Sequence, residues 1–222
     1  MAKKIGVVLS GCGVYDGSEI HEAVITLLAI DRNGAEAVCM APNIPQLHVV
    51  NHLSGEVAGG EARNVLVESA RIARGKIKDL AAVSATELDA LILPGGFGAA
   101  KNLCDFAVKG PECSVNPEVA RIIREMVAAK KPVAAVCIAP AVLSRVLGAD
   151  KLPHQLTIGT DTGTAAALTG MGSQHVSCPV REFVVDKANK IVSTPAYMLA
   201  GSIAEAADGI EKCVKALIGL ID

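Results

Sequence analysis

The sequence predicts a doubly wound α/β fold, in which a mostly parallel sheet is covered by helices on both faces. Short runs of β-branched apolar residues alternate with segments whose apolar residues recur at helical spacing. Apolar residues make up 51% of the chain and aromatic residues only 2%, so Val, Ile, Leu and Ala must fill the core, as is typical of strands buried on both faces. With no internal repeat and no evident linker, residues 1–222 are expected to form a single domain.

The first half of the chain is expected to contain three strands and two helices. Residues 18–32 predict a helix, because apolar residues recur at helical spacing from Ile20 to Leu28 and Gly34 follows as a stop. Glu87 is expected to cap a short turn before the third strand. The expected strands cover residues 5–10, 36–41 and 90–93, the second helix covers 61–74, and the polar segment 42–60 is expected to be a long loop.

The second half repeats the alternation. Pro117 suits the first position of a helix. The expected helices cover residues 117–129, 139–147 and 202–220. The expected strands cover residues 132–136, 156–159, 183–185 and 190–193, with a turn at 186–189 between the last two, and residues 101–116 are expected to be irregular.

Composition and charge exclude several classes of function. A net charge of −2 and few aromatic residues argue against binding to nucleic acid or to an anionic membrane. No apolar run approaches the ~20 residues that span a bilayer, and Gly11-Cys12-Gly13 interrupts the first apolar run too early for a signal peptide. Seven cysteines without CxxC or zinc-type spacing indicate a reducing compartment and no metal. We therefore expect a cytoplasmic protein, in which cysteines such as Cys39 and Cys213 are packing residues.

Cys137 is the strongest candidate for a catalytic residue. It ends the β-branched run of the expected strand 132–136, and a helix of small residues begins directly after it. A cysteine at such a strand-to-helix turn projects from the sheet, and the start of the helix lowers the cost of ionising its thiol. The sequence therefore predicts a reactive thiolate at this position.

Three loops are expected to meet at this edge of the sheet. They are residues 10–17, residues 94–98 and the turn at Cys137, and each follows a strand. The carboxyl ends of strands in an open α/β sheet line one crevice. Residues 94–98 match neither a dinucleotide fingerprint nor a P-loop. The adjacent Gly95 and Gly96 offer free N–H groups that would form an oxyanion hole beside a thiolate, and the alternative is an ordinary turn.

Glu22 is the preferred proton partner of this thiol. It lies one turn into the first helix, and Glu19 shares roughly the same face. A carboxyl buried beside a thiolate has a raised pKa and can move protons for a substrate, whereas the other role open to either glutamate is to interact with the helix dipole. Cys12 is either a second reactive thiol or a small residue in a tight loop. None of the five histidines occupies a recognisable triad position; they are His21, His48, His52, His154 and His175.

These motifs resemble the ElbB-like branch of the ThiJ/PfpI superfamily, whose members are structurally related to class I glutamine amidotransferases. The resemblance rests on residues 9–23, 94–103, 156–161 and 193–200 as well as on the segment around Cys137. It implies a flavodoxin-like sandwich, often a homodimer, with Cys137 as the nucleophile and Glu22 as its carboxyl partner. Backbone donors are implied near Gly96 and Ile138.

The activity that the resemblance implies is that of a glyoxalase without cofactor, metal or glutathione. Such an enzyme converts a small dicarbonyl substrate, methylglyoxal or glyoxal, with water to lactate or glycolate. Residues 14–18 form a longer segment than in shorter relatives, and Tyr15 or Asp16 is expected to line the mouth of the site. Many members of the superfamily place a histidine about twenty residues beyond the nucleophile, where residues 156–161 have none. This departure argues against a Cys-His-acid triad.

Two other functions stay open. The first is a binding or stress-response protein in which Cys137 is a redox sensor that is oxidised to a sulfinate beside Glu22. The second is an amidotransferase or hydrolase subunit, which requires a histidine within hydrogen-bond reach of the sulfur.

Overall fold

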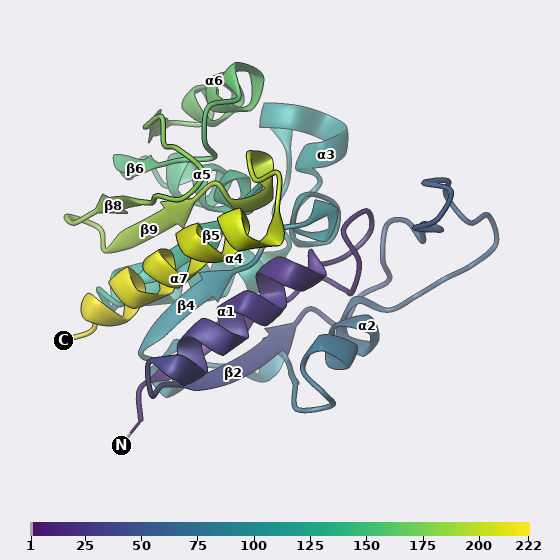
Figure 1. Cartoon of the computed structure of the whole chain (residues 1–222), viewed down its shortest axis with the longest axis horizontal. Helices are drawn as coiled ribbons and strands as arrows, with labels where there is room; N and C mark the ends of the chain where they lie inside the picture. The colour runs from purple at the N-terminus through teal and green to yellow at the C-terminus, as the bar shows by residue number, and fades with distance from the viewer. Residues whose placement is uncertain (1) are drawn as a thin grey trace.

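The computed structural model describes residues 2–222, and within them a seven-stranded sheet forms the centre of the molecule (Figure 1). The strand order is β3-β2-β1-β4-β5-β9-β8. All neighbours are parallel except β8, which runs antiparallel to β9 at one edge. The strands are β1 (Lys4–Val8), β2 (Glu36–Ala41), β3 (Lys78–Asp79), β4 (Ala90–Leu93), β5 (Val133–Val136), β8 (Val184–Asp186) and β9 (Ile191–Thr194). The predicted α/β fold with a mostly parallel sheet is confirmed.

Helices cover both faces of this sheet. Figure 1 shows α1 (Ile20–Arg32) and α7 (Ile203–Gly219) side by side in front of the sheet, with α4 (Pro117–Ala128) and α5 (Pro140–Ala149) behind it. Side chains alternate between the two layers, because successive residues of a strand point to opposite faces. In β4, Ile92 belongs to the core cluster under α1 and α7, whereas its two neighbours belong to the cluster under α4 and α5.

Helix starts agree with the expected caps. Pro117 occupies the first position of α4, and the Asn116 side chain accepts hydrogen bonds from the backbone of that first turn. Ser202 caps α7 in the same way. Before β4, Ser84 and Glu87 form a reciprocal capping box around a short 3-10 turn. Turns of 3-10 helix lie at Leu80–Ala82, Ala85–Glu87, Gly110–Glu112 and Ala196–Met198.

The second helix is shorter than predicted. The expected range 61–74 contracts to α2 (Val65–Ile72). The chain just before it is extended, because Arg63 accepts a backbone hydrogen bond from Gln46 and Val65 donates one to Ile44. This pairing with the long loop holds residues 63–65, so the helix begins only after Asn64, which caps it.

The prediction of a sheet strand at 156–159 is wrong in position and in partner. The strand is β6 (His154–Leu156), and it pairs with β7 (Ser173–His175) in a separate two-stranded sheet. Between them lies α6 (Thr162–Gly170), which the sequence analysis did not predict. Its residues are mostly exposed and Leu168 is its one buried side chain, so the helix carries almost no apolar periodicity.

The segment 101–116 is more ordered than expected. A π-helical turn (Ala99–Leu103) leads into α3 (Phe106–Lys109) and a 3-10 turn. The two ends of this segment then pair, with an antiparallel bridge between Cys104 and Val115.

A substitution at Gly148 would test how tightly α5 packs against the chain that follows α6. A Cβ atom at this position would lie 1.7 Å from the Met171 carbonyl oxygen, which is backbone and cannot rotate away. Gly148→Ala is therefore expected to lower the free energy of unfolding by at least about 2 kcal/mol in urea titrations. Gly170→Ala is the control, because a Cβ there meets no heavy atom within 4 Å; an equal loss in both variants would contradict the packing argument.

No helix within residues 2–222 is long and apolar enough to cross a membrane.

The expected homodimer stays a prediction. On α1, the exposed apolar residues Ile20, Val24 and Leu28 follow one another at four-residue intervals and form a stripe.

Candidate active site

The backbone at Cys137 has the strained turn that a projecting nucleophile needs. Its φ is +61°, a left-handed conformation that is uncommon for a residue with a side chain. The turn is fixed on both sides, because the Cys137 N–H donates to the Thr194 carbonyl at 3.0 Å and the Ala139 N–H donates to Val136 at 3.0 Å. The side chain is directed into the crevice and stays 7% exposed. Such strain is typical of functional sites.

Glu22 is completely buried and held from two sides. Its Oε2 accepts a hydrogen bond from the Gly95 N–H at 3.0 Å, and its Oε1 accepts one from the Tyr197 N–H at 3.1 Å. Its carboxyl group lies beside the Cys137 side chain, and each group affects the pKa of the other. The structure therefore brings together the two residues that the sequence analysis paired.

Glu19 has the structural role and Glu22 faces the thiol. Glu19 caps α1 by accepting the Glu22 N–H at 2.7 Å, and its own N–H donates to the Gly95 carbonyl at 3.0 Å. The cap orients the first turn of the helix, so that Glu22 points under the sheet edge toward Cys137.

The pKa of Glu22 is raised to about 8, first by burial and then by the negative charge of Glu19, against hydrogen bonds from the Tyr197 N–H, the Cys137 thiol and the Gly95 N–H, which lower it. At neutral pH the carboxyl group therefore carries a proton. Since both oxygens accept backbone N–H groups, that proton is available to the sulfur.

Burial also raises the pKa of the Cys137 thiol, followed by the Glu22 charge, whereas the N–H groups of Gly96 and Ile138 lower it. The predicted lowering of the thiol pKa by the start of the helix is thus present, through the Ile138 N–H, but burial outweighs it. Once Glu22 is protonated its charge no longer raises the pKa of the thiol, while the N–H groups of Gly96 and Ile138 still lower it. Burial still opposes ionisation, so a carboxylic acid beside a thiolate is a minor form of the pair at neutral pH.

The buried carboxyl group should make stability depend on pH. The pKa of Glu22 is about 8 in the folded protein against a model value of 4.5, so the folded state holds this proton more tightly than the unfolded state. Its contribution is complete below about pH 4.5 and is lost by about pH 8, with a slope of up to about 1.4 kcal/mol per pH unit. Urea titrations across this range should show that slope in the wild type and a flatter one in Glu22→Gln. Equal slopes would contradict the assignment.

The two glycines are required by close packing around the thiol. A Cβ at Gly95 would lie 2.5 Å from the Cys137 Cβ and 2.7 Å from the Glu22 Oε2. Gly96 has a φ of +93°, and a Cβ there would lie 2.3 Å from the Glu19 backbone nitrogen. The Gly96 N–H lowers the pKa of the Cys137 thiol.

A pocket of about 410 Å³ opens above Cys137. This volume lies in the range of small-molecule sites. Three of its lining residues, Cys137, Gly96 and Ile138, were predicted from the sequence as site residues. The additional lining residues are Val14, Glu19, Phe97, Thr164, Tyr197 and Met198.

Tyr197 is the main functional residue that sequence reasoning missed. The Tyr197 N–H donates a hydrogen bond to Glu22, and the Tyr197 hydroxyl lies 2.8 Å from the Nδ1 atom of His21. It follows β9, the parallel neighbour of β5. The rule that sites lie beyond the carboxyl ends of strands could have found it, had 190–193 been recognised as the neighbour of the strand that carries Cys137.

The three predicted site residues in the loop 10–17 do not line the pocket. Tyr15 is exposed and stacks on His52 with 5.0 Å between ring centroids. Asp16 is buried and its Oδ2 accepts the Val50 N–H at 2.7 Å, so it holds the long loop 42–60. Burial raises the pKa of the Cys12 thiol, and the nearby Glu68 charge raises it further. From this loop, Val14 alone among the lining residues reaches the pocket.

None of the histidines, all of which lie in the described chain, lines the pocket or bonds to Cys137. His21 bonds to Tyr197, and His154 bonds to the Ser173 hydroxyl at 2.6 Å. Residues 2–222 also contain no cluster of three or more His, Cys, Asp or Glu side chains arranged to hold a metal.

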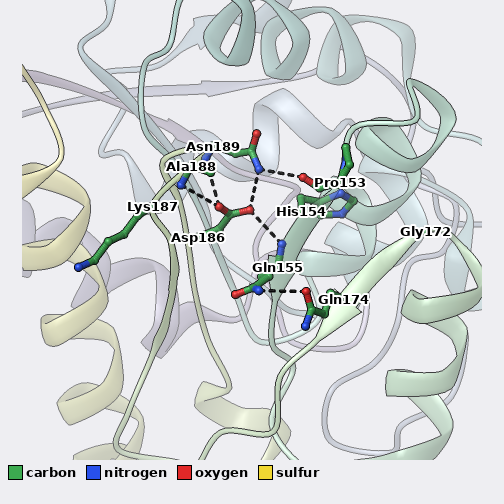
Figure 2. Close-up of a pocket in the computed structure, with 9 residues that line it drawn as sticks. All are labelled: Pro153, His154, Gln155, Gly172, Gln174, Asp186, Lys187, Ala188 and Asn189. Atoms are coloured by element: carbon green, nitrogen blue, oxygen red, sulfur yellow. Dashed lines mark hydrogen bonds between the residues drawn. The ribbon is translucent and has the colours of Figure 1, made fainter.

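A second hollow lies between β6 and the turn after β8 and is polar (Figure 2). Asp186 accepts hydrogen bonds from the backbone of Gln155 and Ala188 and from the Asn189 side chain, at 2.7–3.0 Å. Gln155 and Gln174 bond to each other at 2.9 Å. These polar groups satisfy one another and hold the turn, and no thiol lines this hollow.

Fold and site together define a class: α/β proteins with a cysteine on a strained strand-to-helix turn and a buried acid beside it. A comparison with known protein families identifies the family within this class. The chain belongs to the DJ-1/PfpI family, whose model matches residues 12–187. The predicted membership of the ThiJ/PfpI superfamily is confirmed.

Curated relatives cover nearly the whole chain. The human glutamine amidotransferase-like class 1 domain-containing protein 3, mitochondrial, is 47% identical over 99% of this chain and 84% of its own length. The rat ES1 protein homolog, mitochondrial, is 47% identical over 98% of this chain and 84% of its own. The names place these relatives in mitochondria; a cytoplasmic location for this chain stays a prediction.

Solved structures support the fold. An isoprenoid biosynthesis protein with amidotransferase-like domain from Ehrlichia chaffeensis is 40% identical, with a TM-score of 0.93 over 100% of both chains. Drosophila melanogaster DJ-1beta is 16% identical, with a TM-score of 0.57 over 99% of this chain and 96% of its own, and shares the fold. The first match supports the predicted ElbB-like branch.

Proposed function

We propose that the protein is a cofactor-independent glyoxalase that converts methylglyoxal or glyoxal with water to lactate or glycolate. The observation that carries the proposal is the pairing of Cys137 with Glu22, an acid whose pKa of about 8 lets it give and take a proton near neutral pH. The pocket of about 410 Å³ above the sulfur is large enough to admit a dicarbonyl substrate of a few heavy atoms.

In the first step the Cys137 thiolate attacks the aldehyde carbon of methylglyoxal. The new C–S bond moves the carbonyl electrons onto oxygen, which the N–H groups of Gly96 and Ile138 stabilise. The Glu22 carboxylic acid gives its proton to that oxygen. The products are a hemithioacetal on Cys137 and a Glu22 carboxylate.

In the second step the Glu22 carboxylate acts as a base. It removes the hydrogen of the former aldehyde carbon as a proton, and the electrons form a double bond to the neighbouring carbonyl carbon, whose oxygen takes the negative charge of an enediolate. The Glu22 carboxylic acid then returns a proton to that neighbouring carbon. The hydroxyl proton of the former aldehyde carbon moves to the neighbouring oxygen, which leaves a lactoyl thioester on Cys137 and a Glu22 carboxylate. The backbone bonds from Gly95 and Tyr197 keep the carboxyl group in place for both transfers.

Water then hydrolyses the thioester. Lactate leaves with the water oxygen in its carboxylate, and the Cys137 thiolate is regenerated. Of the two protons of the water, one restores the Glu22 carboxylic acid and the other is released to solvent. Methylglyoxal and one water thus give one lactate and one proton, with no net oxidation. The protein supplies the nucleophile, the proton carrier and the donors.

The test uses wild-type protein and methylglyoxal in deuterated water, without glutathione or added metal. NMR should show lactate with deuterium on C2, because the proton that Glu22 returns comes from a carboxyl group that exchanges with solvent. Absence of lactate would refute the activity. Lactate that retains hydrogen on C2 would instead indicate hydride transfer and refute the proton shuttle.

A second candidate function is redox sensing at Cys137. The protonated Glu22 favours it, because a carboxylic acid can donate a hydrogen bond to an oxygen of a sulfinate. Mild hydrogen peroxide should then add two oxygen atoms to Cys137, which intact-protein mass spectrometry can follow, while methylglyoxal turnover is negligible. An unmodified Cys137 would exclude this function.

An amidotransferase or hydrolase activity is not proposed. Some relatives carry amidotransferase-like names, but this activity needs a base beside the sulfur. In residues 2–222 no histidine is hydrogen-bonded to Cys137, and its polar side-chain partner is Glu22.

A further inference from the structure

Two cysteines outside the active site are brought together by a small β-bridge. Cys104 pairs with Val115, with backbone hydrogen bonds from Asp105 to Ser114 at 3.1 Å and from Asn116 to Leu103 at 2.8 Å. Cys113 lies two residues before Val115. Because alternate residues of an extended chain point to the same side, Cys113 is the diagonal neighbour of Cys104 on that side.

Both cysteines lie in a buried setting on this side of the bridge. Cys104 is 4% exposed and Cys113 is 0% exposed, and both belong to the core cluster under α4 and α5. Both are free cysteines, and each affects the pKa of the other. The chain between them, residues 105–112, is short and largely exposed.

The charges around the pair give the two thiols different roles. The neighbouring Cys104 thiol lowers the pKa of the Cys113 thiol, and the nearby Arg145 guanidinium adds to this against the effect of burial. Arg145 and Cys113 line the same surface hollow. The pKa of the Cys104 thiol is raised, first by the neighbouring Cys113 and then by burial. Cys113 lines the hollow together with the Arg145 guanidinium, whereas Cys104 does not line it, so Cys113 is the better nucleophile of the two.

We propose that Cys104 and Cys113 are a redox-active dithiol that a hydroperoxide oxidises to a disulfide. The Cys113 thiolate attacks the peroxide, the O–O bond breaks, and Cys113 becomes a sulfenic acid while an alcohol, or water from hydrogen peroxide, leaves. The Cys104 sulfur then attacks the Cys113 sulfur, the S–S bond forms and water leaves. The two thiols lose two electrons and the peroxide gains them. A dithiol reductant reverses the reaction by thiol–disulfide exchange.

Access for the oxidant requires a local opening of the segment that joins the cysteines. This segment contains the single helical turn α3, none of whose residues is fully buried and of which Phe106 alone packs against the core cluster. Oxidation also removes the S–H group of Cys104, which donates to the Ala99 carbonyl at 3.3 Å. Ala99 begins the π-helical turn that follows the Gly95-Gly96 loop, so the disulfide changes a contact next to the active-site segment.

A peptide map of the full-length protein tests the proposal directly. Trypsin cleaves after Lys109, between the two cysteines, and yields the peptides 102–109 and 110–121. Reduced protein is treated with hydrogen peroxide, free thiols are blocked with N-ethylmaleimide under denaturing conditions, and the digest is analysed by mass spectrometry. The expected product is a linked pair of these peptides, lighter than their sum by two hydrogen atoms, which dithiothreitol separates.

Three variants sharpen the result. Cys137→Ala should give the same linked pair, which separates this site from the proposed active site. Cys104→Ser should leave a sulfenic acid on Cys113 that dimedone traps, whereas Cys113→Ser should give no dimedone adduct on Cys104. If Cys104→Ser or Cys113→Ser prevents folding, the tryptic peptide map of the wild-type protein still decides whether the disulfide forms. Recovery of both wild-type peptides in fully maleimide-labelled form, or linkage of either to another cysteine, would overturn the proposal.

Discussion

Cys137→Ala is expected to lower kcat/KM for methylglyoxal by at least about 10³-fold, because the variant loses the atom that forms the covalent hemithioacetal. The substitution removes one buried sulfur and keeps a side chain that tolerates the left-handed turn as well as cysteine does. Thermal unfolding should therefore show a folded protein. The measurement is lactate formation followed by NMR at saturating and limiting substrate.

Cys12→Ala is the matched control for this experiment. Cys12 lies at the same end of the sheet but is absent from the pocket wall, and burial raises its pKa. Turnover in Cys12→Ala should stay within a few-fold of the wild type. Retained turnover in Cys137→Ala together with a loss in Cys12→Ala would assign the nucleophile to the other thiol.

Glu22→Gln is the second large effect, with an expected loss of about 10²- to 10⁴-fold in kcat. The amide cannot give a proton to the hemithioacetal oxygen or remove the hydrogen from carbon. It also places an NH₂ group where Glu22 accepts a backbone N–H, from either Gly95 or Tyr197. The unsatisfied donors should cost about 1–3 kcal/mol of stability, so turnover must be measured under conditions where unfolding is absent.

Two comparisons separate chemistry from folding in this case. Glu22→Asp keeps the acid but withdraws it by one methylene from the sulfur, and it should also lose most activity. Glu19→Gln removes the neighbouring charge that raises the pKa of Glu22, while its amide oxygen still caps α1. It should shift the pH profile of turnover to lower pH. Full activity in Glu22→Gln would refute the proton shuttle even if Cys137 proved essential.

The sequence was a good guide to the central sheet and to the helices with strong apolar periodicity. The segments 18–32, 117–129 and 202–220 were predicted within two residues of α1, α4 and α7, because each buries one regular face. Predictions were poorer where tertiary pairing overrides local preference. α2 starts late because residues 63–65 pair with the long loop, and α6 was missed because few of its side chains are buried.

The residues of the candidate site likewise fall into those that a local sequence pattern predicts and those whose position depends on tertiary contacts. Cys137, Glu22 and the Gly95-Gly96 pair could be predicted because each follows directly from a strand end or from the first helical turn beyond one. Tyr15 and Asp16 lie in the right loop, yet their side chains turn toward residues 50–52 and not toward the pocket. Which way a loop side chain points depends on distant partners, and no local pattern records them.

By itself the sequence determined the fold class, the identity of the thiol and the kind of partner it needs, because strand and helix periodicity place residues along a sheet edge. The tertiary structure alone decided how that partner behaves. Complete burial and two backbone N–H groups set the protonation of Glu22, and these come from Gly95 and Tyr197, which lie 73 and 175 residues away in the chain. Tertiary structure also joined Cys104 to Cys113, because only the bridge to Val115 puts both thiols on one side.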